Sequence, residues 1–290
     1  MILLAVLVAL ALERMVGHVP MIGQPVVLRW AILDLHRLLP WQAYWRSAIA
    51  ACLPLILAMA GVHLLDTLVS GVIADLVFSA GVLLLCLGPR DLGVDIKELI
   101  EAREADDVAR EKELTRVLLR VPDRRRSRRS LIGALFIQSH ERLFGVLLWF
   151  FLLGPAGAAA YRVVSHLPRL FHRIEPDTQA ERAAVLLHAA FAWIPTRVTA
   201  LMYLLSGSTD SALDGWRRVN QHPDLDWQQR TWARLAETAA GALAVEIVEG
   251  APSVSADLDE CLREVIELQG RALLVLLAGF AVFTTGNWIA

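Results

Sequence analysis

The stretch Glu141-Arg-Leu-Phe-Gly-Val-Leu-Leu-Trp-Phe-Phe-Leu-Leu-Gly-Pro-Ala-Gly-Ala-Ala-Ala-Tyr161 decides the fold class of this chain. It is a long apolar run that begins with two charged residues and is interrupted by a Gly-Pro-Ala-Gly break. An ionisable residue at membrane depth is costly, so it usually pairs, faces the protein interior or marks a functional pocket. A helix break at that depth needs neighbouring protein groups to satisfy the freed backbone. The stretch therefore predicts a membrane protein with a polar site near a broken helix.

The composition of the whole chain agrees with this prediction. Hydrophobic residues make up 56% of the sequence and charged residues 20%, and the mean hydropathy is +0.49. The net charge of -2 argues against a nucleic-acid partner. Cys52, Cys86 and Cys261 have no metal-ligand spacing, so we expect free thiols. The apolar residues 1–12 lack a basic region and a cleavage site, which indicates a retained membrane element rather than a signal peptide.

Four regions are long and apolar enough to supply membrane-spanning helices, each of which needs about 20 residues. Residues 48–88 are expected to form two helices, with His63, Asp66 and Ser70-Gly71 in the turn between them. The other three regions are 143–164, 183–205 (interrupted by Pro195 and Arg197) and 271–290. Strand pairs are not indicated. The predicted fold is an all-α, polytopic integral-membrane helical bundle with soluble helical lobes.

The same pattern divides the chain into five segments. They are an N-terminal membrane segment with a helical hairpin (1–88), a basic amphipathic cytoplasmic region (89–133), central membrane helices with breaks (134–207), a soluble helical lobe (208–270) and a C-terminal membrane helix (271–290). Basic residues flank the hairpin on both sides, which predicts that both flanks are cytoplasmic. The densest basic cluster should set this topology and contact anionic lipids. It comprises Arg124, Arg125, Arg126, Arg128 and Arg129.

The sequence also predicts where two helices begin. Thr178-Gln-Ala-Glu181 precedes an apolar run and has the spacing of a capping box, and Asp226-Trp-Gln-Gln229 repeats the pattern.

Polar residues inside or beside the apolar segments are the candidates for function. The set comprises Glu13, Arg14, Asp75, Gln138, Glu141, Arg142, His188 and Arg197. Gln138 and Glu141 are three residues apart and should share one helix face, whereas Arg142 could extend to the membrane interface. Glu13-Arg14 could be only an interfacial pair, and Asp75 could be a structural partner of an arginine. We predict that Asp75, Gln138, Glu141 and Arg197 converge on one polar pocket, and separate salt bridges are the alternative.

Arg197 is the most specific of these candidates because it follows Pro195 inside an apolar segment. A proline frees a carbonyl one turn earlier, and a guanidinium can bind either that carbonyl or an anionic ligand. A purely structural arginine at the kink is equally compatible with the sequence. The histidines and cysteines form no metal-binding motif, and nucleotide-binding P-loop and nucleophile-elbow motifs are absent from the sequence. We therefore predict no metal site from the motifs.

Several segments together resemble the AmpE proteins, which lie within the larger CobD/CbiB membrane family. They are the apolar start closed by Glu13-Arg14, Cys86-Leu-Gly-Pro-Arg-Asp-Leu92 with Asp106-Asp-Val-Ala-Arg110, the Glu141–Arg162 stretch and Trp193-Ile-Pro-Thr-Arg197. The AmpE resemblance implies a multi-pass protein of the bacterial inner membrane. It also implies a regulatory or sensory role in peptidoglycan recycling and β-lactamase induction, with a functional link to the amidase AmpD.

The wider resemblance implies an alternative function. CobD/CbiB proteins are membrane enzymes that join an amino alcohol or its phosphate to cobyric acid with ATP, so ATP and magnesium are implied cofactors. Two departures argue against corrin amidation here. Ser165-His-Leu-Pro-Arg169 replaces the family's Asn-Thr-Leu-Asp-Ser, and His188-Ala189 replaces a paired Asp. These changes remove oxygen donors that suit magnesium.

The sequence leaves two interpretations of different class. The first is an AmpE-type regulator or sensor, and the second is a membrane-embedded amide ligase or transferase with a pocket that binds ATP or another anion. The lipid bilayer is the expected partner in both, an anionic small molecule is a candidate ligand, and a homo-oligomer is compatible with either.

Overall fold

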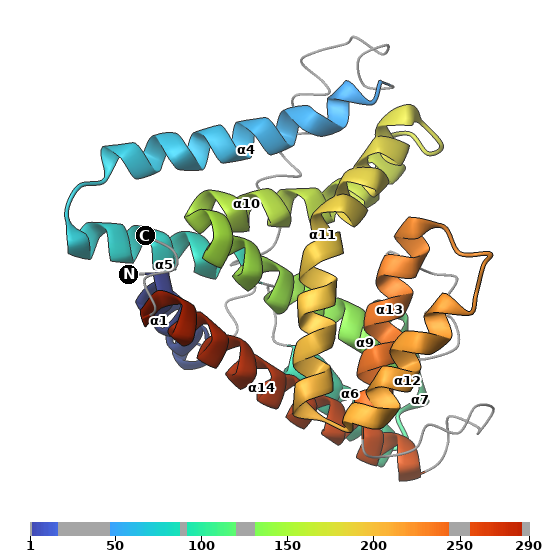
Figure 1. Ribbon diagram of the computed structural model, residues 1–290. Coiled ribbons are helices and arrows are strands. Elements are labelled where there is room, and N and C mark those ends of the chain that lie inside the picture. Colours follow the sequence, from blue (N-terminus) through green and yellow to red (C-terminus); the bar gives the residue numbers. More distant parts are fainter. Residues whose placement is uncertain (1, 17–46, 88–91, 120–130, 244–255, 286–290) are drawn as a thin grey trace. The chain divides into compact units, whose positions relative to one another are not determined.

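The computed structural model describes residues 2–16, 47–87, 92–119, 131–243 and 256–285, and helices joined by short turns make up these ranges (Figure 1). No strand occurs within them. Four helical stretches are long and apolar enough to cross a membrane: Ile49–Leu68, Leu131–Ile174, Gln179–Ser206 and Leu258–Thr285. The predicted all-α, polytopic membrane fold is thereby confirmed. The five arginines between positions 124 and 129 lie outside the described residues.

The chain forms two compact units, each assembled from separate parts of the sequence. The first comprises Met1–Pro89 and Gly145–Ala192, and the second comprises Arg90–Phe144 and Trp193–Ala290. Each unit therefore combines residues from both halves of the chain.

The first unit contains α1 (Ile2–Val16), α4 (Ile49–Leu68), α5 (Val72–Cys86), α10 (Gly145–Ile174) and the beginning of α11 (Gln179–Ser206). Helix α10 packs against α4 and α5, and α1 packs against α5. Small residues of α4 and α11 allow close packing against larger side chains of α10. The buried cluster comprises Ala50, Ala51, Val163, Leu167, Leu170, Phe171, Ala180 and Ala184.

The predicted hairpin between positions 48 and 88 is present as α4 and α5 (Figure 1). Its turn is shorter than expected, because His63 and Asp66 lie inside α4 and the chain reverses only after Leu68. Gly71 has a φ of 105°, which is open to glycine but strained for other residues. Local backbone geometry therefore places the turn at Ser70-Gly71.

Helix α10 reverses its direction at Gly154, which has φ 65° and ψ -154°. A Cβ atom added to Gly145 would lie 2.4 Å from the ring of Tyr161. In a straight helix those two positions would be about 24 Å apart at 1.5 Å per residue. The Gly-Pro break expected from the sequence is therefore confirmed. The interval 143–164, which was expected to be a single span, consists of two helical arms folded against each other.

The sequence predicted an interruption at Pro195, but α11 continues through this proline as one helix. The proline removes one backbone donor but does not interrupt the helix. The freed carbonyl belongs to Phe191, and the indole of Trp149 supplies the missing donor. A neighbouring side chain has thus replaced the helical hydrogen bond, so no break is needed.

The second unit contains α6 (Leu92–Glu104), α7 (Val108–Leu118), α9 (Leu131–Ser139), the π-helical turn η1 (His140–Phe144), the end of α11, α12 (Thr209–Asn220), α13 (Trp227–Ala242) and α14 (Ala256–Thr285). Helices α12 and α13 form a tight hairpin (Figure 1). A Cβ atom on Gly215 would lie 2.2 Å from the carbonyl oxygen of Glu237. Glycine is therefore required where the two backbones approach.

The last helix, α14, begins well before the predicted membrane segment at 271. Its polar first half pairs with α6, where Arg103 Nε donates to Asp259 Oδ1 at 2.6 Å and Arg263 Nη2 donates to Glu104 Oε1 at 2.8 Å. Burial lowers the pKa of Arg103, but hydrogen bonds and charges from Asp259 and Glu111 outweigh it and raise the pKa overall. These ion pairs extend the helix beyond its apolar part.

Both predicted helix starts are confirmed. Glu181 N donates to Thr178 Oγ1 at 3.2 Å, and Gln229 N donates to Asp226 Oδ1 at 2.7 Å. The side chain of Glu181 accepts from Asp177 N at 2.7 Å. Side-chain caps therefore begin α11 and α13, as their sequences predicted.

Candidate functional site

Buried polar residues gather where α9 passes into the π-helical turn η1. Gln138, Ser139, His140 and Glu141 have exposures of 5%, 1%, 0% and 6%. A π-helical turn inserts an extra residue into a helix, and such turns are frequent at functional sites. Two of the predicted pocket residues, Gln138 and Glu141, therefore lie on one buried segment of the second unit.

Arg142 connects this segment to α6. Its Nη1 donates to Asp95 Oδ2 at 2.6 Å, and its Nη2 donates to Gln138 Oε1 at 2.5 Å. The amide of Gln138 donates in turn to the carbonyl oxygens of Leu118 at 2.5 Å and Val117 at 3.2 Å. We refer to Asp95, Gln138 and Arg142 as the η1 network. Arg142 thus pairs in the protein interior, which corrects the expectation that it extends to the interface.

The η1 network holds a charge pair in a fixed position. Asp95 lies in the first turn of α6, where the helix dipole favours a carboxylate. The guanidinium makes a charge-assisted bond to that carboxylate and a second bond to a neutral amide. Asp95 and Gln138 are buried and Arg142 is partly buried, so breaking this charge pair would be costly. The arrangement is a rigid polar centre made from α6, α9 and η1.

His140 forms a second set of polar contacts in the same unit. The hydroxyl of Thr199 donates to the Pro195 carbonyl at 2.8 Å, and His140 Nδ1 lies 3.0 Å from the same hydroxyl oxygen. Because the Thr199 hydroxyl donates its only proton to the Pro195 carbonyl, it can only accept from His140. Nδ1 of His140 is therefore the protonated donor, and Nε2 is left as an acceptor. Beside it, Tyr203 donates to Ser139 Oγ at 3.2 Å.

The sequence did not single out Asp95, His140 or Thr199. Asp95 is one of many charged residues on an amphipathic helix, and nothing near it in the chain indicates that it is buried. His140 and Thr199 are isolated polar residues in apolar segments. A weak signal exists for Thr199, because a threonine four residues after a proline can bond to the proline's carbonyl.

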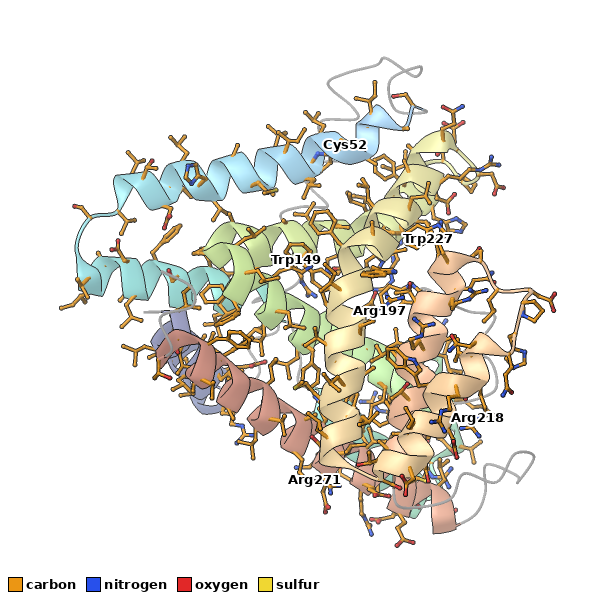
Figure 2. The ribbon with its side chains drawn as sticks, in the orientation of Figure 1. Cys52, Trp149, Arg197, Arg218, Trp227 and Arg271 are labelled. Carbon is orange, nitrogen blue, oxygen red and sulfur yellow. The ribbon has the colours of Figure 1, made fainter. Side chains whose placement is uncertain are left out.

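Arg197 lies on α11, where Figure 2 labels it. Its Nη1 donates to the carbonyl oxygen of Trp193 at 2.7 Å, and its guanidinium lies 3.8 Å from the centre of the Trp193 ring. Within the described residues no carboxylate forms an ion pair with it. Arg197 therefore binds a backbone carbonyl near the proline, but that of Trp193 and not the freed carbonyl of Phe191, which Trp149 holds.

The remaining predicted candidates lie in the first unit. Asp75 is exposed in the first turn of α5, Arg14 is exposed near the end of α1, and Glu13 is half-buried beside it. Gln138, Glu141, Arg142 and Arg197 lie in the second unit. The convergence of the whole set on one pocket stays a prediction.

A basic cluster lies in the first unit at positions that the resemblance had identified. Arg162, His166 and Arg169 follow one face of α10 at spacings of four and three residues. Arg162, Arg169 and His188 all interact electrostatically with His166, and the His188 ring is centred 6.4 Å from that of Tyr161. Thus the two segments that depart from the family pattern come together in space.

This basic cluster does not suit magnesium. Hard divalent cations prefer carboxylate and carbonyl oxygens, whereas the side chains gathered here are guanidinium and imidazole groups. Among the described residues, no group of three His, Cys, Asp or Glu side chains is placed to hold a metal ion. The basic cluster therefore does not itself supply the oxygen donors that the resemblance implies for magnesium.

Comparison with known proteins places this architecture in a family. The model described as "CobD/Cbib protein" matches residues 6–248. The chain belongs to the CobD/CbiB family. The matched region includes the η1 network, the basic cluster and Arg197, so all of these are features of a CobD/CbiB-family membrane protein.

A curated relative supports the same placement. The chain is 30% identical over 124 residues to the "Cobalamin biosynthesis protein CobD" of Chromobacterium violaceum. That match covers 42% of this CobD/CbiB-family chain and 38% of the relative. No solved structure matches the chain. Neither match names AmpE, so the comparisons support the wider family rather than the regulatory interpretation.

Proposed function

We propose that this protein is a membrane-embedded amide ligase or transferase related to CobD/CbiB, which acts on a carboxylic acid and an amino alcohol or its phosphate. Membership of the CobD/CbiB family supports the reaction class. The partial match to a cobalamin biosynthesis protein favours a corrinoid substrate, although residues 165–169 and 188–189 depart from the family pattern. The observation that carries the proposal is the η1 network, in which the buried Asp95 and Gln138 hold the partly buried guanidinium of Arg142 inside the family region.

The chemistry expected of this centre is electrostatic positioning. A preorganised and partly desolvated cation stabilises negative charge on a reacting carboxyl group, because its position needs no rearrangement during the reaction. The bonds to Asp95 and Gln138 hold Arg142 in place. We assign these three residues a positioning role and no covalent step.

The test uses the purified full-length protein in detergent with cobyric acid, aminopropanol phosphate, ATP and magnesium. Amide formation would be followed by mass spectrometry and phosphate release by a coupled assay. We expect product with the natural protein and at least tenfold less with Arg142→Lys, which keeps the charge but loses the planar two-point geometry. Arg116→Lys is the control, since Arg116 forms an exposed ion pair with Glu113. Absence of product from folded natural protein would contradict the proposal.

A regulatory function of the AmpE type is the second candidate, and the basic cluster of the first unit favours it. Beside this cluster the carboxylates implied by the resemblance are missing, because Pro168 stands at the family's Asp and His188-Ala189 at its paired Asp. A regulator needs no turnover, so deletion of the gene should change β-lactamase induction even if the purified protein forms no amide. Unchanged induction in the deletion strain would count against this candidate.

A further inference from the structure

Three arginines from two helices of the second unit are close enough for their charges to act on one another. Arg197 comes from α11, and Arg230 and Arg234 come from α13, where their spacing of four residues places them on one face. The charge of Arg234 acts on Arg197, and that of Arg230 acts on Arg234. We refer to these three residues as the arginine cluster.

Neutral groups hold each member of the arginine cluster. Arg197 stacks on the Trp193 ring and donates to that residue's carbonyl. Arg234 lies 4.7 Å from the centre of the Trp216 ring and donates to Asn220 Oδ1 at 2.8 Å. Arg230 donates to the carbonyl oxygen of Leu225 at 3.0 Å. Tryptophan faces and amide oxygens orient a guanidinium without neutralising its charge.

Two acidic residues near the cluster form other contacts. Glu237 of α13 lies 4.0 Å from Arg218 of α12, and Asp226 caps the start of α13. In the described ranges, no carboxylate forms an ion pair with Arg197, Arg230 or Arg234. The cluster therefore has an uncompensated positive charge within the part of the chain that the structure describes.

Two buried donors of the cluster also lack acceptors. The Nε atoms of Arg230 and Arg234 are inaccessible to solvent and make no hydrogen bond to any described residue. Burial, followed by the neighbouring Arg230 charge, lowers the pKa of Arg234. A buried donor without a partner is costly, and close like charges add to that cost. A bound anion would offset the cost of the like charges.

The side chains themselves are only half-buried, so a ligand has access to them. Arg197, Arg230 and Arg234 all have intermediate exposure. The cluster lies where an apolar candidate membrane helix, α11, meets the polar helix α13.

We propose that Arg197, Arg230 and Arg234 form a binding site for a phosphate group. Guanidinium groups match phosphate oxygens in geometry as well as in charge, which makes arginine the usual residue for such sites. The phosphate is carried either by a soluble molecule or by the headgroup of an anionic phospholipid. The site uses none of the residues of the η1 network, so it does not depend on the proposed amide chemistry.

The experiment uses the full-length protein in a neutral detergent and follows its thermal unfolding. One arm adds inorganic pyrophosphate, and the other adds phosphatidylglycerol, with phosphatidylcholine as the uncharged comparison. We expect saturable stabilisation by at least one of the two anionic probes. Stabilisation by pyrophosphate identifies a soluble ligand, and stabilisation by phosphatidylglycerol alone identifies a headgroup.

The variants Arg230→Gln and Arg234→Gln should weaken the response at least tenfold in probe concentration. Arg218→Gln is the matched control, because it removes the same charge from the exposed surface of α12 and should leave the response unchanged. Arg234→Lys serves if a glutamine variant does not fold, since it retains the charge and loses the fork geometry. No saturable response from the natural protein, or an equal response from the cluster variants and Arg218→Gln, would overturn the proposal.

Discussion

The indole Nε1 of Trp149 donates a hydrogen bond of 3.0 Å to the carbonyl oxygen of Phe191, four residues before Pro195. A helix normally satisfies that carbonyl with the backbone N–H of the residue four positions later, and proline has none. The rings of Trp149 and Phe191 also pack with centroids 5.0 Å apart. One side chain from α10 therefore lets α11 continue through a proline at membrane depth, where an unsatisfied carbonyl would be costly.

Trp149→Phe should lower the stability of the detergent-solubilised protein by about 1 kcal/mol, because it removes the donor and keeps most of the ring. Thermal unfolding followed by circular dichroism would measure the change. Pro195→Ala restores the backbone donor to Phe191, so the penalty of Trp149→Phe should fall towards zero in that background. An equal penalty with and without Pro195 would show that the hydrogen bond is not the cause.

Arg142→Leu should destabilise the protein by about 3–5 kcal/mol, because it removes the cation that pairs with the buried Asp95 carboxylate. The double variant Asp95→Asn with Arg142→Leu should recover much of that loss. Denaturant titration of the single and double variants would measure both changes. Additive losses in the double variant would contradict direct coupling between the two residues.

Gly145→Ala should destabilise the protein by about 1–3 kcal/mol, since its Cβ would lie 2.4 Å from the Tyr161 ring and the two arms of α10 would have to move apart. Gly61→Ala in α4 is the control, because its Cβ would have no atom within 4 Å. Alanine is also the better helix former, so Gly61→Ala should be neutral or slightly stabilising. Equal effects on melting temperature would rule out a special requirement at position 145.

The basic flanks of the α4–α5 hairpin predict that residues 124–129 are cytoplasmic and that the turn near Ser70 lies on the opposite side of the membrane. In a background without native cysteines, Ser70→Cys should react with an impermeant thiol reagent in cells whose outer membrane is permeabilised. Ser127→Cys should react only after lysis. Labelling of Ser127→Cys before lysis would reverse the predicted topology.

Local interactions explain what the sequence determined by itself. The helical class, the apolar spans, the Gly154-Pro155 break and the caps at Thr178 and Asp226 depend on residues within one or two turns of one another. Apolar periodicity, backbone preference and side-chain capping act over that range, so their signals are present in a short window of sequence. The same reasoning located Gln138, Glu141, Arg142 and Arg197, because charged and amide groups are conspicuous in apolar surroundings.

Contacts between distant residues were decided only by the tertiary structure. Asp95 and Arg142 are 47 positions apart, and Trp149 and Phe191 are 42 apart. Nothing near Asp95 in the chain indicates that it is buried, and nothing near Pro195 identifies Trp149 as its compensating donor. The arginine cluster likewise exists only because α11 and α13 meet, since Arg230 and Arg234 belong to a helix that the sequence describes as polar and soluble. A buried charge or a freed carbonyl is costly without a hydrogen-bond partner, but the tertiary packing determines which residue is close enough to be that partner.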